Sequence, residues 1–127
     1  MKVSKLFGGL AVAVASLFLL SACGSSSSED TSVSDIEDKG TLVVALNPEF
    51  APFEFKTLID GKDTIVGADV EIAKAIAEEL GVNVKFSSMS FNNVLASLQS
   101  GKADIAISGI SATEERKKAY DFSDPYY

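Results

Sequence analysis

The stretch GKADIAISGISATEERKKAYDFSDPYY, residues 101–127, contains the features that decide the fold. Its pattern predicts a buried strand over residues 103–107, a polar turn over residues 108–113 and a short helix that begins at Glu114. In open α/β folds, ligands bind beyond the carboxyl ends of the strands, where helix N-termini present free N–H groups to anions. The stretch brings small hydroxyls and Arg116 to such a place, which predicts a receptor for a small anion.

Two strand patterns lie upstream of this stretch. Residues 41–46, TLVVAL, form a continuous apolar run, which is typical of a parallel strand covered on both faces. In residues 82–86, apolar and polar side chains alternate, which indicates a strand exposed on one side and close to a sheet edge. Residues 55–66 read as a small hairpin that turns at Asp60-Gly61. The apolar run is therefore the expected central strand.

Two amphipathic helices are predicted between these strands. Residues 69–80 carry an apolar stripe and end before Gly81, with Asp69 among the acidic residues expected mostly off the stripe. Residues 91–98 have apolar side chains at helical spacing, and Ser90 is a candidate N-cap. The order β-α-β-α-β with right-handed crossovers predicts an α/β fold whose parallel sheet has the strand order 2-1-3.

The N-terminus has the features of an export signal. Lys2 and Lys5 precede an apolar run over residues 6–20, and Leu-Ser-Ala-Cys at residues 20–23 resembles the bacterial lipobox. We therefore expect residues 1–22 to be a lipoprotein signal peptide and Cys23 to be the acylated N-terminus. Residues 23–40 are Ser-rich and acidic, which predicts a solvated linker, and residues 41–127 then form the folded part.

Two segments resemble a known family. ADIAISGISATEERKKAYDFSDPYY and GADVEIAKAIAEEL are similar to sequences in the polar amino-acid-binding proteins of ABC importers, the bacterial solute-binding protein family 3. Ala68 departs from the bulky residue usual there. The resemblance implies the first lobe of a two-lobed, periplasmic-binding-protein-like (type II) fold. We expect the second lobe, and the returning strand that completes the first, to lie outside this chain.

The resemblance also implies a binding site. Ser108, Gly109, Ser111 and Arg116 match the positions that hold the ligand's α-carboxylate, a role suited to a two-pronged guanidinium. The alternative is that Ser111 or Thr113 only caps the helix and that Arg116 is solvated.

Two aromatic residues and one amide extend this expected site. Phe50 and Phe91 match the aromatic walls of the ligand site, although both could instead belong to the core, as we expect for Phe53 and Phe55. Asn47 stands where many relatives have an aspartate, which puts a cationic ligand in doubt.

Composition limits the other possible functions. The 127 residues include no His and one Cys, which excludes His or multi-Cys metal clusters and Ser-His or Cys-His catalytic pairs, and we expect no cofactor. Structural roles are expected for Asp104, Asp121 and Asp124. The whole chain has a net charge of −7; without residues 1–22, 9 Lys and Arg remain against 18 Asp and Glu, a formal charge of −9, which argues against nucleic acid or anionic lipid as partners.

The resulting prediction is a receptor rather than an enzyme. We expect a lipid-anchored protein on the extracytoplasmic face of the cell membrane that delivers a polar amino acid to the permease subunits of an ABC importer. The alternatives are an enzyme on the same fold, such as a dehydratase or a cell-wall lyase relative, and a sensor ectodomain.

Overall fold

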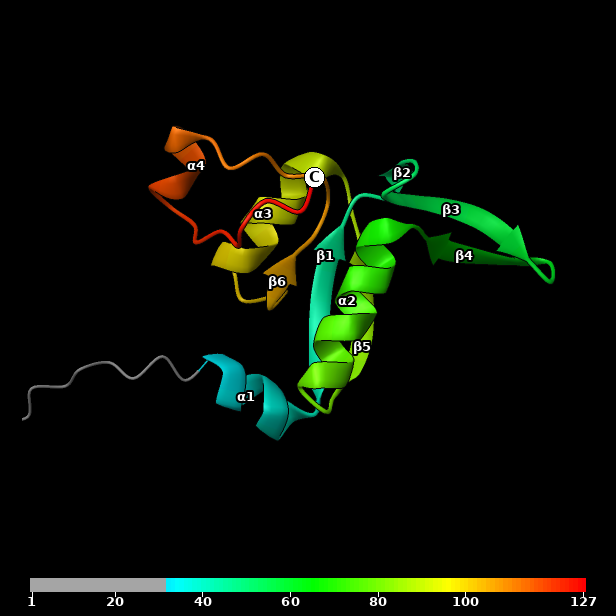
Figure 1. Cartoon of the computed structure of the whole chain (residues 1–127), viewed down its shortest axis with the longest axis horizontal. Coiled ribbons are helices and arrows are strands. Elements are labelled where there is room, and N and C mark those ends of the chain that lie inside the picture. Colours follow the sequence, from blue (N-terminus) through cyan, green and yellow to red (C-terminus); the bar gives the residue numbers. More distant parts are fainter. Residues whose placement is uncertain (1–31) are drawn as a thin grey trace, which may run out of the picture.

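A parallel three-stranded sheet forms the centre of the computed structural model, which describes residues 32–127 (Figure 1). Strand β1 (Thr41–Leu46) lies between β5 (Asn83–Ser88) and β6 (Ile105–Ala106). In order along the chain these are strands 2-1-3, so the predicted topology is confirmed. β6 is shorter than predicted, although amides of Asp104 and Ile107 still donate to carbonyls of β1.

Helices cover both faces of this sheet (Figure 1). α2 (Ala68–Glu79) packs through Ala73 and Ala77 onto the face that carries Leu42 and Val44. α3 (Phe91–Gln99) packs through Val94 onto the opposite face, which includes Val43 and Ala45. Because successive side chains of a strand point to opposite faces, the apolar run of β1 supplies both halves of the core.

A second small sheet extends from the carboxyl end of β1. It consists of β2 (Glu49–Phe50), β3 (Glu54–Ile59) and β4 (Lys62–Val66), in the order β2-β3-β4. The β3–β4 hairpin turns at Asp60-Gly61 as predicted and projects away from the helices (Figure 1). Its root, at Glu54, lies beside the end of the parallel sheet.

The predicted linker is wrong for residues 32–39, which form helix α1 (Ser32–Lys39). Ile36 is 8% exposed and packs with Leu42 and Val44, so the one buried side chain of the helix joins the core. Lys39 Nζ lies 2.7 Å from Asp104 Oδ2, which also accepts a hydrogen bond from the amide of Val43. Asp104 therefore has the structural role that the sequence predicts.

The chain leaves β6 through a turn and the short helix α4 (Glu114–Lys117), which stands away from the sheet (Figure 1). The last residues have no regular secondary structure and return to the carboxyl end of the sheet, where Tyr126 contacts α2 and Tyr127 contacts Phe53. None of the helices within residues 32–127 combines the length and apolarity needed to span a bilayer.

Candidate functional site

The predicted site residues gather where the parallel strands end. Asn47 follows β1, Ser108 and Gly109 follow β6 by a few residues, and Phe91 begins α3 just after β5. Because the three strands are parallel, their carboxyl ends meet at one edge of the sheet. The site has an open part around Arg116 and a buried part around Ser108.

In the open part, Arg116 lies over Phe91. The guanidinium carbon is 5.8 Å from the centre of the Phe91 ring, and Nη1 donates to the carbonyl of Ser111 at 3.0 Å. No carboxylate of the described residues forms a salt bridge with Arg116. The remaining N–H groups of the guanidinium therefore have no acidic partner within this part of the chain, which suits them to an incoming carboxylate.

Ser111 does not cap helix α4. Thr113 is the N-cap residue, and its Oγ1 accepts from the amide of Arg116 at 3.3 Å. Of the two predicted capping residues, the structure uses Thr113. The side chain of Ser111 stays exposed at the rim of a cavity. Ser90, the predicted cap of α3, makes no capping hydrogen bond with its side chain.

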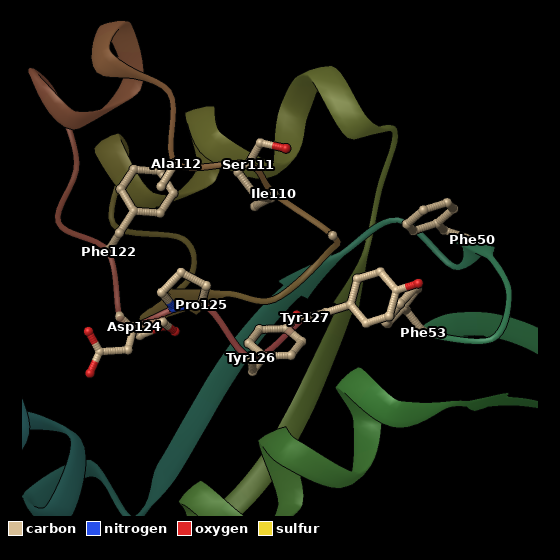
Figure 2. A pocket seen from close by; sticks show the side chains of 12 residues that line it. Phe50, Phe53, Ile110, Ser111, Ala112, Phe122, Asp124, Pro125, Tyr126 and Tyr127 are labelled. Atoms are coloured by element: carbon tan, nitrogen blue, oxygen red, sulfur yellow. The ribbon is translucent and has the colours of Figure 1, made fainter.

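Aromatic rings line this cavity of about 440 Å³ (Figure 2). Phe50 stacks on Phe53 with ring centres 5.3 Å apart, and Tyr127 meets Phe53 edge-on at 4.9 Å. Phe50 is 50% exposed and Phe91 is 40% exposed, so neither is a core residue. The prediction that Phe53 belongs to the core is wrong, because its ring is half-buried and forms part of the wall.

Gly109 allows Phe50 to lie against the backbone. Its φ of 57° is in the left-handed region, and a Cβ there would meet the Phe50 ring at 2.8 Å. Glycine is thus required both by the backbone conformation and by the close ring.

The hydroxyl of Ser108 belongs to the buried part of the site. It donates to Oε1 of Glu54 at 2.7 Å and accepts from the amide of Asn47 at 2.9 Å. Ser108 is 3% exposed, and Glu54 is fully buried. Within the described residues, this hydroxyl thus joins the end of β1 to the hairpin.

Asp69 is the second buried acid. Its Oδ1 accepts from the hydroxyl of Tyr126 at 2.7 Å, and its Oδ2 accepts from the amide of Gly109 at 3.3 Å. Burial, followed by hydrogen bonding with Asp69, raises the pKa of Glu54 to about 8. Burial and the same aspartate also raise the pKa of Tyr126. A protonated Glu54 is therefore the form that suits this environment at neutral pH.

Sequence reasoning missed Glu54, Asp69 and Tyr126. A signal existed for Asp69, because it precedes the buried Ala73 and Ala77 by one and two helical repeats of four residues. Glu54 alternates with Phe53 and Phe55, and the structure buries the glutamate fully while leaving both phenylalanines partly exposed. The prediction that the two phenylalanines belong to the core is therefore wrong, because it assigned the buried face of this segment to them and not to Glu54.

Asn47 and Phe91 do not line the cavity of about 440 Å³; they border a second hollow of about 380 Å³, together with Glu49 and Lys56. The side-chain nitrogen Nδ2 of Asn47 donates to the carbonyl of Met89 at 3.0 Å, which connects the end of β1 to the segment after β5. The structure thus places Asn47 at the site but engages its side-chain N–H group with the backbone. Glu49 supplies a carboxylate close by.

Comparisons with known proteins identify the family of this chain. Residues 42–127 match the family of bacterial extracellular solute-binding proteins, family 3. The arginine-binding extracellular protein ArtP of Bacillus subtilis is 42% identical over 93% of this chain and 43% of its own length. The chain thus spans about two fifths of this curated relative.

Solved structures show the same similarity. The substrate-binding protein AbpA of Streptococcus pneumoniae, bound to L-arginine, is 66% identical with a TM-score of 0.73, over 74% of this chain and 40% of that one. The arginine-bound form of domain 1 from TmArgBP, of T. maritima, is 47% identical with a TM-score of 0.68, over 73% of this chain and 71% of that one. From its fold and these matches, the chain belongs to the bacterial extracellular solute-binding proteins, family 3.

Proposed function

We propose that this chain is the ligand-binding lobe of an exported receptor that binds a polar amino acid and delivers it to an ABC importer. The observation that carries the proposal is the open guanidinium of Arg116, held over Phe91 and beside Ser111 at the carboxyl end of the parallel sheet. A two-pronged donor in this position suits the α-carboxylate that all amino acids share.

An amino acid with a cationic side chain, L-arginine above all, is the ligand that we propose. The relatives ArtP, AbpA and domain 1 of TmArgBP are described as arginine-binding or arginine-bound. The neutral Asn47 argues against such a ligand, but Glu49 lines the same hollow as Asn47 and Phe91. Its carboxylate and the Phe91 ring together offer an ion pair and a cation–π surface to a guanidinium.

One lobe is expected to hold the ligand with reduced affinity. The arginine-bound form of domain 1 from TmArgBP supports binding by a single lobe. A ligand on one open surface stays partly solvated, however, and lacks the contacts that closure between two lobes provides. We therefore expect this chain to bind L-arginine more weakly than a two-lobed relative does.

Titration calorimetry tests the proposal directly. The purified chain is titrated with L-arginine, L-histidine, L-glutamine and L-cystine, and the ligand is recovered afterwards to establish that it is chemically unchanged. Arg116→Ala should abolish measurable binding. Lys118→Ala removes an exposed cation beside the same helix and is the matched control, which should bind as the unmodified chain does. Equal binding by both variants would contradict the assignment of Arg116.

Attachment to the membrane through Cys23 is the second part of the proposal. Residues 1–31 lie outside the part of the chain that the structure describes, so support comes from the sequence of the apolar run and the lipobox-like Leu-Ser-Ala-Cys. Mass spectrometry of the membrane-extracted protein should find diacylglycerol on Cys23, and Cys23→Ala should remove it. A mature protein with a free thiol at Cys23 would contradict the anchor.

An enzymatic function has less support. The relatives compared above are described as binding proteins. The two buried acids, Glu54 and Asp69, are closed off from solvent and engaged with Ser108 and Tyr126, so they do not face an incoming substrate.

A further inference from the structure

Four segments that are far apart in the sequence meet at one group of polar side chains, in which Glu54, Asp69 and Ser108 are buried and Tyr126 is 51% exposed. Glu54 comes from the root of the hairpin, Asp69 from the first turn of α2, Ser108 from the turn after β6, and Tyr126 from the returning C-terminal segment. Both carboxyl groups belong to residues with no exposed surface. Such a group is costly to bury unless its hydrogen bonds are complete.

The hydrogen bonds are complete only when Glu54 carries a proton. Its Oε1 accepts from Ser108, whereas Oε2 is the one buried side-chain oxygen or nitrogen within residues 32–127 that has no donor. An ionised carboxylate would leave that oxygen unsatisfied next to a second acid. A proton on it turns it into a donor for Asp69, the neighbour whose hydrogen bond raises the pKa of Glu54.

The backbone holds the two acids in this arrangement. The first two amides of α2 donate to the carbonyls of Pro52 and Phe53, so α2 begins directly on the root of the hairpin. Gly67, with φ of 130°, allows the close approach, because a Cβ there would overlap the carbonyl of Phe53. The backbone of Asp69 therefore cannot move away from the root of the hairpin without displacing α2, and its side chain is held by Gly109 and Tyr126.

These two acids hold the turn at Ser108 and Gly109, which forms part of the proposed ligand site, through hydrogen bonds. Glu54 holds the hydroxyl of Ser108, and Asp69 holds the amide of Gly109, against which Phe50 packs. We propose that Glu54 and Asp69 position this turn through one proton kept between their carboxyl groups, so that amino-acid affinity depends on that proton. The part of this proposal that concerns amino-acid affinity rests on the proposed function.

The direction of the effect follows from the charges that face Glu54. These are Asp69 from α2, which adds to burial in raising the pKa of Glu54, and Tyr126 from the C-terminal segment, whose own pKa is raised by burial and by Asp69 and Glu54. Loss of the proton leaves two adjacent buried carboxylates, which repel one another and loosen the hold on Ser108 and Gly109. Affinity should therefore fall as pH rises through about 8.

The first experiment follows the proton without using a ligand. In the full chain, the side-chain carboxyl carbon of Glu54 and the amide of Gly109 are followed by NMR from mildly acidic to alkaline pH. Both signals should change with one common midpoint near pH 8, and Glu54→Gln should abolish the transition at Gly109. Glu78→Gln, on the exposed side of α2, should leave it unchanged. An ordinary titration of Glu54 near pH 4.5, or a Gly109 signal that does not follow it, would overturn the proposal.

The second experiment measures L-arginine binding by calorimetry below and above the same midpoint. The chain should lose about tenfold in affinity, which is the scale of one hydrogen bond to a charged group. Glu54→Gln keeps a donor for Asp69 and an acceptor for Ser108, so it should bind with constant affinity at both pH values. A pH-independent affinity in the unmodified chain would overturn the positioning role. If no amino acid binds at either pH, the proposed function fails, and the NMR titration alone decides whether the pair holds its proton.

Discussion

The buried and open parts of the site differ in how completely their polar groups are used. Around Ser108, the hydroxyls of Ser108 and Tyr126 and the backbone amide of Asn47 each have an acceptor inside the protein, and Glu54 and Asp69 are fully buried. Around Arg116, which is half-buried, the guanidinium donates to one carbonyl and lies over one aromatic ring, and it has no acidic partner among the described residues. The buried part therefore fixes geometry, while the open part keeps hydrogen-bonding capacity for a ligand. Changes to the first should alter folding, and changes to the second should alter binding alone.

The largest effect on stability is expected for Asp69→Ala. The change removes the acceptor for Tyr126 and Gly109 and leaves a hole beside Glu54, which should cost about 2 to 4 kcal/mol of unfolding free energy. Glu71→Ala on the exposed side of α2 is the control, and it should change stability by less than about 0.5 kcal/mol. Urea unfolding followed by circular dichroism gives both values. Similar losses for the two variants would remove the distinction between the buried and open parts.

The protonation of Glu54 should make stability depend on pH. Because its pKa in the folded chain lies above the ordinary 4.5, the folded state keeps a proton that the unfolded state loses between these values. The stability that this proton contributes is fully present below pH 4.5 and is lost as pH rises through about 8.

The dependence of unfolding free energy on pH can be measured as the difference between the unmodified chain and the Glu54→Gln variant. Between these pH values, the unmodified chain should lose up to about 1.4 kcal/mol for each pH unit relative to Glu54→Gln. Urea unfolding of both chains over this range gives the difference, which cancels the titration of the other carboxyl groups. A constant difference would show that Glu54 is ionised in the folded chain.

In the open part, Arg116→Lys should weaken binding without affecting the fold. Lysine keeps the positive charge but loses the two-pronged geometry, so L-arginine should bind more weakly by about 1 to 3 kcal/mol. Urea unfolding of this variant should match that of the unmodified chain. A loss of stability as large as that of Asp69→Ala would mean that Arg116 is a structural residue.

The smallest effect separates two roles of Gly109. Gly101→Ala places a side chain at φ of 71° with no atom within 4 Å, so it measures backbone strain alone, about 1 kcal/mol. Gly109→Ala has a similar φ but also meets the Phe50 ring, so it should cost about 0.5 to 1 kcal/mol more as the ring is displaced. Equal costs in urea unfolding would show that Phe50 moves freely.

The sequence by itself determined the parallel sheet, its strand order, its two covering helices, the turn that carries Ser108 and Gly109, and the short helix that carries Arg116. These depend on local patterns: an apolar run, a helical repeat, and glycines at element ends. Such patterns can be recognised in the sequence because each reflects the secondary structure of its own segment and which of its faces is buried. They were less reliable for residues 32–39, which form a helix with Ile36 in the core. The polar residues around Ile36 made this segment look like a linker.

Only the tertiary structure decided what the polar residues do. Glu54, Asp69, Ser108 and Tyr126 are separated by up to 72 positions, and no local pattern relates them until α2, the hairpin and the C-terminal segment pack together. The pKa of Glu54 depends on burial and on the neighbouring Asp69, which are properties of the packed chain. Side-chain spacing specifies elements, whereas protonation and hydrogen-bond partners follow from their assembly.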